Sequence, residues 1–97
     1  MKTTQEILDL LREFKRTSAE KYGIEQLALF GSAARGEQRE DSDIDICVKL
    51  RKTTFRNYMS ILEDLEKLFR RKVDLSTLHE NMRQLFRQNI ERDAIYI

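Results

Sequence analysis

The chain has 97 residues, with 18 basic and 17 acidic side chains and a net charge of +1. This length predicts one compact domain spanning residues 1–97. The near balance of charge argues against strong direct binding to long nucleic acids, because that binding depends on many phosphate contacts. The single cysteine, Cys47, excludes an internal disulfide and fits a reducing, cytoplasmic compartment. No apolar run is long enough to predict a membrane span.

The first predicted element is an amphipathic helix that begins after Thr3. Thr3 and Glu6 have the spacing of a capping box, in which each side chain bonds to the backbone of the other residue. The apolar residues that follow lie on one stripe of a helix: Ile7, Leu8, Leu11 and Phe14. We expect the helix to end near Lys21, because Gly23 can adopt the left-handed conformation that ends helices.

Two strands joined by a short turn come next. Residues 26–30 are mostly apolar, which is typical of a strand buried on both faces. Gly31 and Ser32 end this strand, residues 33–35 predict one helical turn, and Gly36 stops it. The charged residues 37–41 predict a loop. Residues 42–50 predict the second strand, in which aliphatic residues alternate with polar ones, so the polar face carries both aspartates, Asp43 and Asp45.

The second half of the chain predicts two helices and a short strand. An amphipathic pattern runs from Phe55 to Phe69, and residues 73–75 form a strand with Asp74 on its polar face. Apolar residues within 82–90 predict a last helix, and we assign His79, in the connection before it, a surface or capping role. The tail, residues 94–97, is predicted to be an edge strand or a partner contact.

This order of elements predicts the α+β class, as a two-layer structure in which a small mixed sheet has helices packed on one face. The opposite face is then free near the three aspartates.

The aspartates predict a metal site. Asp43 and Asp45 would project from the same strand face about 7 Å apart, and two such carboxylates repel each other unless a cation lies between them. Mg²⁺ prefers a few carboxylates together with water and phosphate oxygens. Asp74, from a separate strand, could supply a third carboxylate and accept the proton of an attacking hydroxyl, as in sites that hold two ions.

The Gly31–Ser32 turn predicts a phosphate site. Glycine allows the backbone to approach a phosphate closely, and the amides that open a helix favour an anion. The Ser32 hydroxyl adds a donor. Arg35 could reach a phosphate or pair with one of the aspartates, and the sequence leaves both alternatives open.

Each feature also has a purely structural interpretation. A Gly-Ser pair after a strand is often only a turn, and an Asp-x-Asp pair is often a solvated strand face. Asp74 could form a surface ion pair with Arg70 or Arg71, which contributes little. Their coincidence in one short chain favours a shared site.

The combined pattern resembles the signature of the polymerase-β-type nucleotidyltransferase superfamily. The resemblance is carried by Gly31-Ser32-x-Ala34-Arg35-Gly36, followed by Ser42-Asp43-x-Asp45. The short length resembles the minimal nucleotidyltransferases, called MNT proteins, many of which are antitoxins of HEPN–MNT toxin–antitoxin pairs. The resemblance implies the nucleotidyltransferase fold, similar to the palm of polymerase β.

The resemblance also implies roles for individual residues. Gly31 and Ser32 would bind the triphosphate, Asp43 and Asp45 would bind Mg²⁺, and Asp74 would be the third carboxylate. The implied reaction transfers AMP from ATP to a hydroxyl, in some family members a tyrosine, of a HEPN toxin. The chain would then be the antitoxin of a type VII-like pair.

The acceptor is the least determined part of this hypothesis. The chain has no residues beyond the core that could form an acceptor-binding domain, which favours a partner protein and either a homodimer or a hetero-oligomer with the toxin. The alternatives are transfer to a small molecule or RNA end, and neutralisation of the toxin by binding without catalysis.

Overall fold

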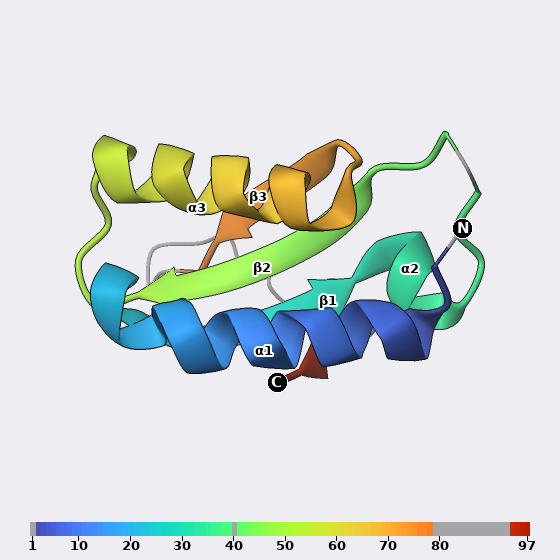
Figure 1. Cartoon of the computed structure of the whole chain (residues 1–97), viewed down its shortest axis with the longest axis horizontal. Helices are drawn as coiled ribbons and strands as arrows, with labels where there is room; N and C mark the ends of the chain where they lie inside the picture. The colour runs from blue at the N-terminus through green and yellow to red at the C-terminus, as the bar shows by residue number, and fades with distance from the viewer. Residues whose placement is uncertain (1, 40, 79–93) are drawn as a thin grey trace.

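The computed structural model of the chain shows a four-stranded mixed sheet with helices on one face (Figure 1). It describes residues 2–39, 41–78 and 94–97. The elements in chain order are α1 (Thr4–Tyr22), β1 (Ile24–Phe30), α2 (Gly31–Arg35), β2 (Ile44–Leu50), α3 (Phe55–Phe69), β3 (Val73–Thr77) and β4 (Ile95–Tyr96). This arrangement confirms the predicted α+β class. Among the described residues, no helix has the length and apolarity needed to cross a lipid bilayer.

Helix α1 begins and ends as its sequence predicts. Thr3 Oγ1 accepts a hydrogen bond from Glu6 N at 3.1 Å, and Thr3 N donates to Glu6 Oε1 at 3.1 Å, which completes the capping box. Gly23 adopts the left-handed conformation at φ +68° and donates its N–H to the carbonyl of Ala19. Both ends of the helix are therefore determined by local residue chemistry.

The sheet has the strand order β3-β2-β1-β4. Strand β1 pairs antiparallel with β2 and with β4, whereas β2 pairs parallel with β3. The tail therefore forms the edge strand that its sequence predicts, and a contact between the tail and a partner stays a prediction. Strand β1 begins at Ile24, two residues earlier than predicted, and β3 continues to Thr77 instead of ending at residue 75.

The start of β2 differs from the prediction, and the difference affects the site. The strand begins at Ile44, so Ser42 and Asp43 precede it rather than belong to it. Ser42 is held in a turn with Arg39: Ser42 N donates to the Arg39 carbonyl at 3.0 Å, and Arg39 N donates to Ser42 Oγ at 3.1 Å. These hydrogen bonds hold Ser42 in a turn, so regular strand pairing starts only after Asp43.

Helices α1 and α3 lie side by side over one face of the sheet, as Figure 1 shows. The largest fully buried side chains of this core come from both long helices and both central strands: Ile7, Leu11, Leu27, Leu29, Ile44, Ile46, Val48, Ile61 and Leu65. The other face carries a smaller cluster formed by Ala28 and Cys47, with Phe30, Leu78 and Ala94 packed against them. The predicted helix within 82–90 and His79 lie outside the described residues.

A hydrogen bond joins the two long helices. Tyr22, at the end of α1, donates its hydroxyl to Asp64 Oδ2 on α3 at 2.6 Å. This hydrogen bond, together with burial, raises the pKa of Tyr22 to about 12. Because the folded state favours the protonated hydroxyl, the stabilisation is present below about pH 10 and is lost as the pH rises towards 12.

We predict that Tyr22→Phe lowers the free energy of unfolding by about 1–2 kcal/mol at pH 7, because the hydrogen bond to a carboxylate is lost while the ring stays buried. Urea unfolding of the wild type, Tyr22→Phe, Asp64→Ala and the double variant measures the coupling between the two side chains. Additive effects of the two substitutions would contradict this prediction.

Candidate active site

The candidate site is built around Asp45 on β2. Strand pairing places Asp45 opposite Phe30 of β1 and, on its other side, opposite Asp74 of β3. Residues opposite each other in a sheet project from the same face, and the neighbours Ile44 and Ile46 point into the helix-covered core. Asp45 and Asp74 therefore meet on the face that α1 and α3 leave uncovered, as the sequence predicts.

Electrostatic interactions connect the three carboxylates. Burial raises the pKa of Asp45 to about 6, and the charges of Asp74 and Asp43 and a side-chain hydrogen bond with Asp74 contribute further. The positive charge of Arg35 acts in the opposite direction. Asp43 precedes the strand, but its charge still acts on Asp45. The carboxylates around Asp45 therefore carry negative charge that a bound cation would stabilise.

Gly31 lies against the Asp45 carboxylate. Its φ is +70°, and a Cβ atom placed on it would lie 2.1 Å from Asp45 Oδ2 and 2.9 Å from Asp45 Cγ. Any side chain at this position would overlap the carboxylate. The sequence indicated that glycine lets the backbone approach a phosphate, but it did not predict that Asp45 itself requires the glycine.

Ser32 and Arg35 lie on α2, directly after Gly31. Ser32 is half-buried, and its carbonyl accepts the N–H of Glu37 at 2.8 Å. No side chain among residues 2–39, 41–78 and 94–97 caps the start of α2, which is compatible with the predicted anion site. Arg35 Nε forms an ion pair with Glu37 Oε2 at 3.2 Å, an arrangement that the sequence analysis did not consider. The predicted contact of Arg35 with a phosphate stays a prediction.

The structural alternative for Asp74 is not observed. Within the described part of the chain, Asp74 forms no ion pair with Arg70 or Arg71. Arg71 instead donates hydrogen bonds to backbone carbonyls of the turn before Asp43. The exposed Asp74 carboxylate is therefore available on the same sheet face as Asp45.

The carboxylates near Asp45 are of the kind that bind Mg²⁺ together with waters and substrate phosphates. Among the described residues, no group of three or more His, Cys, Asp or Glu side chains is close enough to hold an ion by itself. A structural zinc site needs such a closed set of four ligands, whereas Mg²⁺ is usually bound by one or two carboxylates, several waters and substrate phosphates. The crowded, partly buried Asp45 carboxylate is the main protein ligand expected of an open site of that kind.

Comparison with known protein families shows the family to which the chain belongs. The sequence pattern of the family described as "Polymerase beta, Nucleotidyltransferase" matches residues 12–97, which include every candidate site residue. The chain belongs to this family. It is therefore a nucleotidyltransferase, and the resemblance carried by the Gly-Ser turn and the paired aspartates is confirmed.

Individual nucleotidyltransferases match the chain along its length. It is 43% identical over 100 residues to "Putative protein adenylyltransferase MJ1379" of Methanocaldococcus jannaschii, with all of both chains covered. It is 31% identical over 98 residues to protein adenylyltransferase MntA of Thermococcus cleftensis, covering 100% of this chain and 98% of the relative. A solved structure described as a "putative minimal nucleotidyltransferase" has a TM-score of 0.79 at 29% identity, covering 97% of this chain and 95% of that chain.

The same fold occurs in a toxin–antitoxin complex. The structure of tri-AMPylated Shewanella oneidensis HEPN toxin with MNT antitoxin contains a chain that matches with a TM-score of 0.59 at 20% identity. The match covers 96% of this chain and 66% of that chain. At this identity the similarity concerns the fold alone.

We predict that Gly31→Ala lowers the free energy of unfolding by about 2 kcal/mol more than Gly36→Ala. Both glycines have φ near +70°, so backbone strain is matched, but a Cβ on Gly36 would meet only Thr4 Oγ1 at 3.8 Å. The larger loss of stability in Gly31→Ala reflects overlap of the new Cβ atom with the Asp45 side chain. Urea unfolding of both variants measures the difference, which should vanish when the two substitutions are compared in an Asp45→Ala background. An equal cost in the presence of Asp45 would contradict the close contact.

We predict that Asp45→Asn has a higher free energy of unfolding than the wild type at pH 7.5 when a chelator has removed any metal. A raised pKa means that the folded state holds the proton more tightly, so ionisation between about pH 4 and pH 6 destabilises the fold. The full shift corresponds to about 3 kcal/mol, and solvent screening at this half-buried group reduces the effect to about 1–2 kcal/mol.

Urea unfolding from pH 4 to pH 7.5 checks this prediction. The difference between Asp45→Asn and the wild type should shrink towards zero as the pH falls to about 4. The exposed Asp41, substituted as Asp41→Asn, is the control. A difference for Asp45→Asn that does not change with pH would show that ionisation of Asp45 is not its cause.

Proposed function

We propose that this nucleotidyltransferase transfers AMP from ATP to a hydroxyl of a partner protein, with Mg²⁺ as cofactor, and that residues 1–97 act as one domain. The observation that carries the proposal is the pairing of Asp45 with Asp74 beside Gly31 on the face opposite the long helices, where the charge of Asp43 also acts on Asp45. The similarity to proteins named protein adenylyltransferases supports ATP as the nucleotide and a protein as the acceptor.

Asp43 and Asp45 are the proposed metal ligands. The Asp45 carboxylate is partly buried between Gly31 and Asp74, so its position is restricted by packing as well as by the strand. Bound Mg²⁺ would neutralise triphosphate charge and lower the pKa of the attacking hydroxyl. Asp43, on the turn before β2, would approach the same ion from the side of the loop.

Asp74 is the proposed proton acceptor. It is exposed, lies next to Asp45 on the neighbouring strand and is therefore accessible to a hydroxyl presented by another molecule. In the reaction, the acceptor oxygen bonds to the α-phosphorus of ATP while the bond between that phosphorus and the bridging oxygen breaks. Pyrophosphate leaves, and the hydroxyl proton passes to Asp74. Positioning and charge neutralisation carry this kind of catalysis.

Gly31, Ser32 and Arg35 are proposed to bind the triphosphate. The uncapped start of α2 offers backbone donors, Ser32 adds a hydroxyl, and Arg35 already contributes positive charge to the carboxylate group. Because Arg35 pairs with Glu37 in this structure, phosphate binding would exchange that exposed ion pair for a stronger contact.

The proposed acceptor is a tyrosine of a HEPN toxin, so that the chain acts as an antitoxin in a type VII-like pair. The fold similarity to a chain in the complex of tri-AMPylated HEPN toxin with MNT antitoxin supports this partner class. The proposed use of ATP, together with the single cysteine of the chain, supports a cytoplasmic location.

The test is co-expression of the chain with a HEPN-type partner, followed by intact-mass measurement of the partner. We expect the wild type to add one or more AMP units, and Asp43→Asn with Asp45→Asn to add none. The matched control is Asp9→Asn with Glu25→Gln, which removes the same charge from exposed positions outside the site and should leave transfer unchanged.

The measurement also separates the alternatives. A partner that remains unmodified yet is neutralised by both the wild type and the double variant would indicate an antitoxin that acts by binding alone. AMP transfer to RNA or to a small molecule, with the partner unmodified, would replace the proposed acceptor but keep the chemistry.

A further inference from the structure

Of the three candidate carboxylates, Asp45 and Asp74 lie on strands, whereas Asp43 does not. Strand β2 begins one residue later, and the segment from Glu37 to Asp43 forms no helix or strand in its described residues. A metal ligand in such a segment needs other contacts to restrict it, because loose ligands lose affinity. The contacts around Asp43 show where that restriction comes from.

Both peptide groups of Asp43 are anchored to the segment that connects α3 with β3. On one side, the Ser42 carbonyl accepts a hydrogen bond from Arg71 Nη2. On the other side, Ile44 N donates to the Lys72 carbonyl at 3.1 Å. Because the Ser42 carbonyl and the Ile44 amide belong to the two peptide units that flank Asp43, these bonds together restrict its backbone angles.

Arg71 also closes the preceding turn. The same nitrogen, Nη2, donates to the carbonyl of Arg39 at 2.6 Å, so one guanidinium group bridges both ends of the turn from Arg39 to Ser42. The connecting segment is itself fixed, because Glu66 Oε2 on α3 accepts the N–H of Val73 at 3.1 Å. Asp74 follows directly, so the segment that anchors Asp43 also leads into the third carboxylate.

We infer that Arg71 is a positioning residue for metal binding: by bridging the carbonyls of Arg39 and Ser42, it holds Asp43 at the site formed by Asp45 and Asp74. This inference rests on the proposed function, because it takes Asp43 as a ligand of Mg²⁺. Arg71 acts through backbone contacts rather than by touching the substrate or the metal. Its side chain is therefore expected to affect metal affinity, whereas its exposed neighbour Lys72 contributes only a backbone carbonyl.

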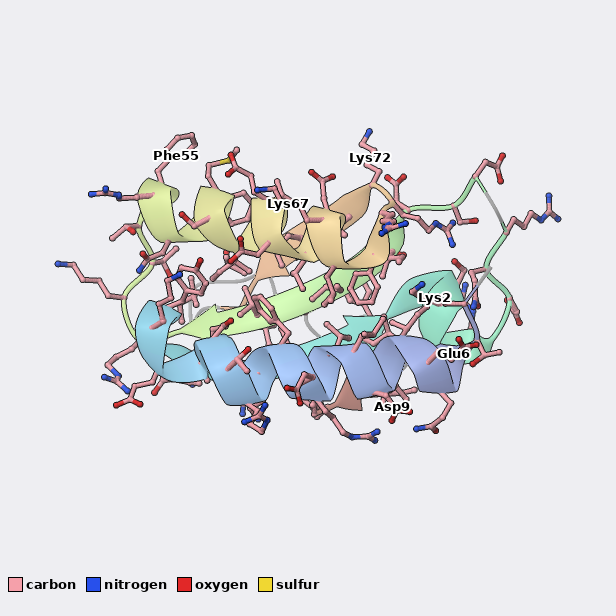
Figure 2. All side chains as sticks on the ribbon, in the orientation of Figure 1. Lys2, Glu6, Asp9, Phe55, Lys67 and Lys72 are labelled. Carbon is pink, nitrogen blue, oxygen red and sulfur yellow. The ribbon has the colours of Figure 1, made fainter. Side chains whose placement is uncertain are left out.

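The chemistry of the contact suggests an informative pair of variants. Arg71→Met keeps a long apolar stem but removes every donor. Arg71→Lys keeps one charged nitrogen, and a single nitrogen is what both carbonyls contact in the structure. Lys72→Met is the matched control, since Figure 2 shows the Lys72 side chain pointing away from the rest of the molecule.

The experiment titrates Mg²⁺ into each full-length variant at one fixed concentration of a non-hydrolysable ATP analogue, without partner, and follows the melting temperature. We expect Arg71→Met to raise the Mg²⁺ concentration at half-maximal stabilisation about tenfold, as for other residues that orient metal ligands. Arg71→Lys should restore most of the affinity, and Lys72→Met should match the wild type. Hydrogen exchange of the amides in residues 39–44 should be faster in Arg71→Met than in the other proteins.

Unchanged Mg²⁺ affinity and unchanged exchange in Arg71→Met would overturn the inference. Should Arg71→Met fail to fold, Arg71→Gln, which keeps a shorter neutral donor, takes its place, with an affinity expected below that of Arg71→Lys. An affinity of Arg71→Gln equal to that of the wild type would then overturn it. If the wild type itself shows no response to Mg²⁺, the proposed function fails instead, and faster exchange in Arg71→Met would still support the anchoring of the turn.

Discussion

The contact between Gly31 and Asp45 is the constraint on which the site depends. Gly31 opens α2 directly after β1, Asp45 lies on β2, and the pairing of Phe30 with Asp45 brings the two residues together. A shift of one residue in this register would turn Asp45 towards the helices and bring an aliphatic side chain to the opposite face. The buried aliphatic residues of β2 resist that shift, so the hydrophobic core indirectly fixes the position of a carboxylate.

The features that depend on local chemistry could be predicted from the sequence. Capping by Thr3 and Glu6 defines the start of α1, and the alternation of aliphatic and polar residues in β2 correctly assigns Asp45 to the face opposite α1 and α3. The mixed sheet followed from the order of elements. The choice of Asp74 as a partner of Asp45 depended on recognising a lone carboxylate in a short strand, and the parallel pairing of β2 with β3 confirms their proximity.

Features that depend on contacts between distant residues could not be predicted in the same way. The alternating pattern places Asp43 in the strand, but hydrogen bonds between Arg39 and Ser42 and the anchoring by Arg71 keep it outside. The sequence offers Arg71 only as a possible surface partner of Asp74, because nothing near it in the chain indicates carbonyl acceptors 32 and 29 residues away. The sequence likewise leaves Arg35 to reach a phosphate or an aspartate, and its ion pair with Glu37 becomes visible only in the folded loop.

The short strand β4 has a consequence for self-association. It pairs with Ala28 and Leu29 of β1, and Ile97 N donates to the Leu27 carbonyl at 2.9 Å. These contacts cover the backbone groups of an apolar strand that would otherwise lie at the edge of the sheet. An uncovered strand of this composition is a template for pairing with another molecule. The tail thus protects β1 from forming intermolecular sheets, and molecules in which it detaches would be the ones that aggregate.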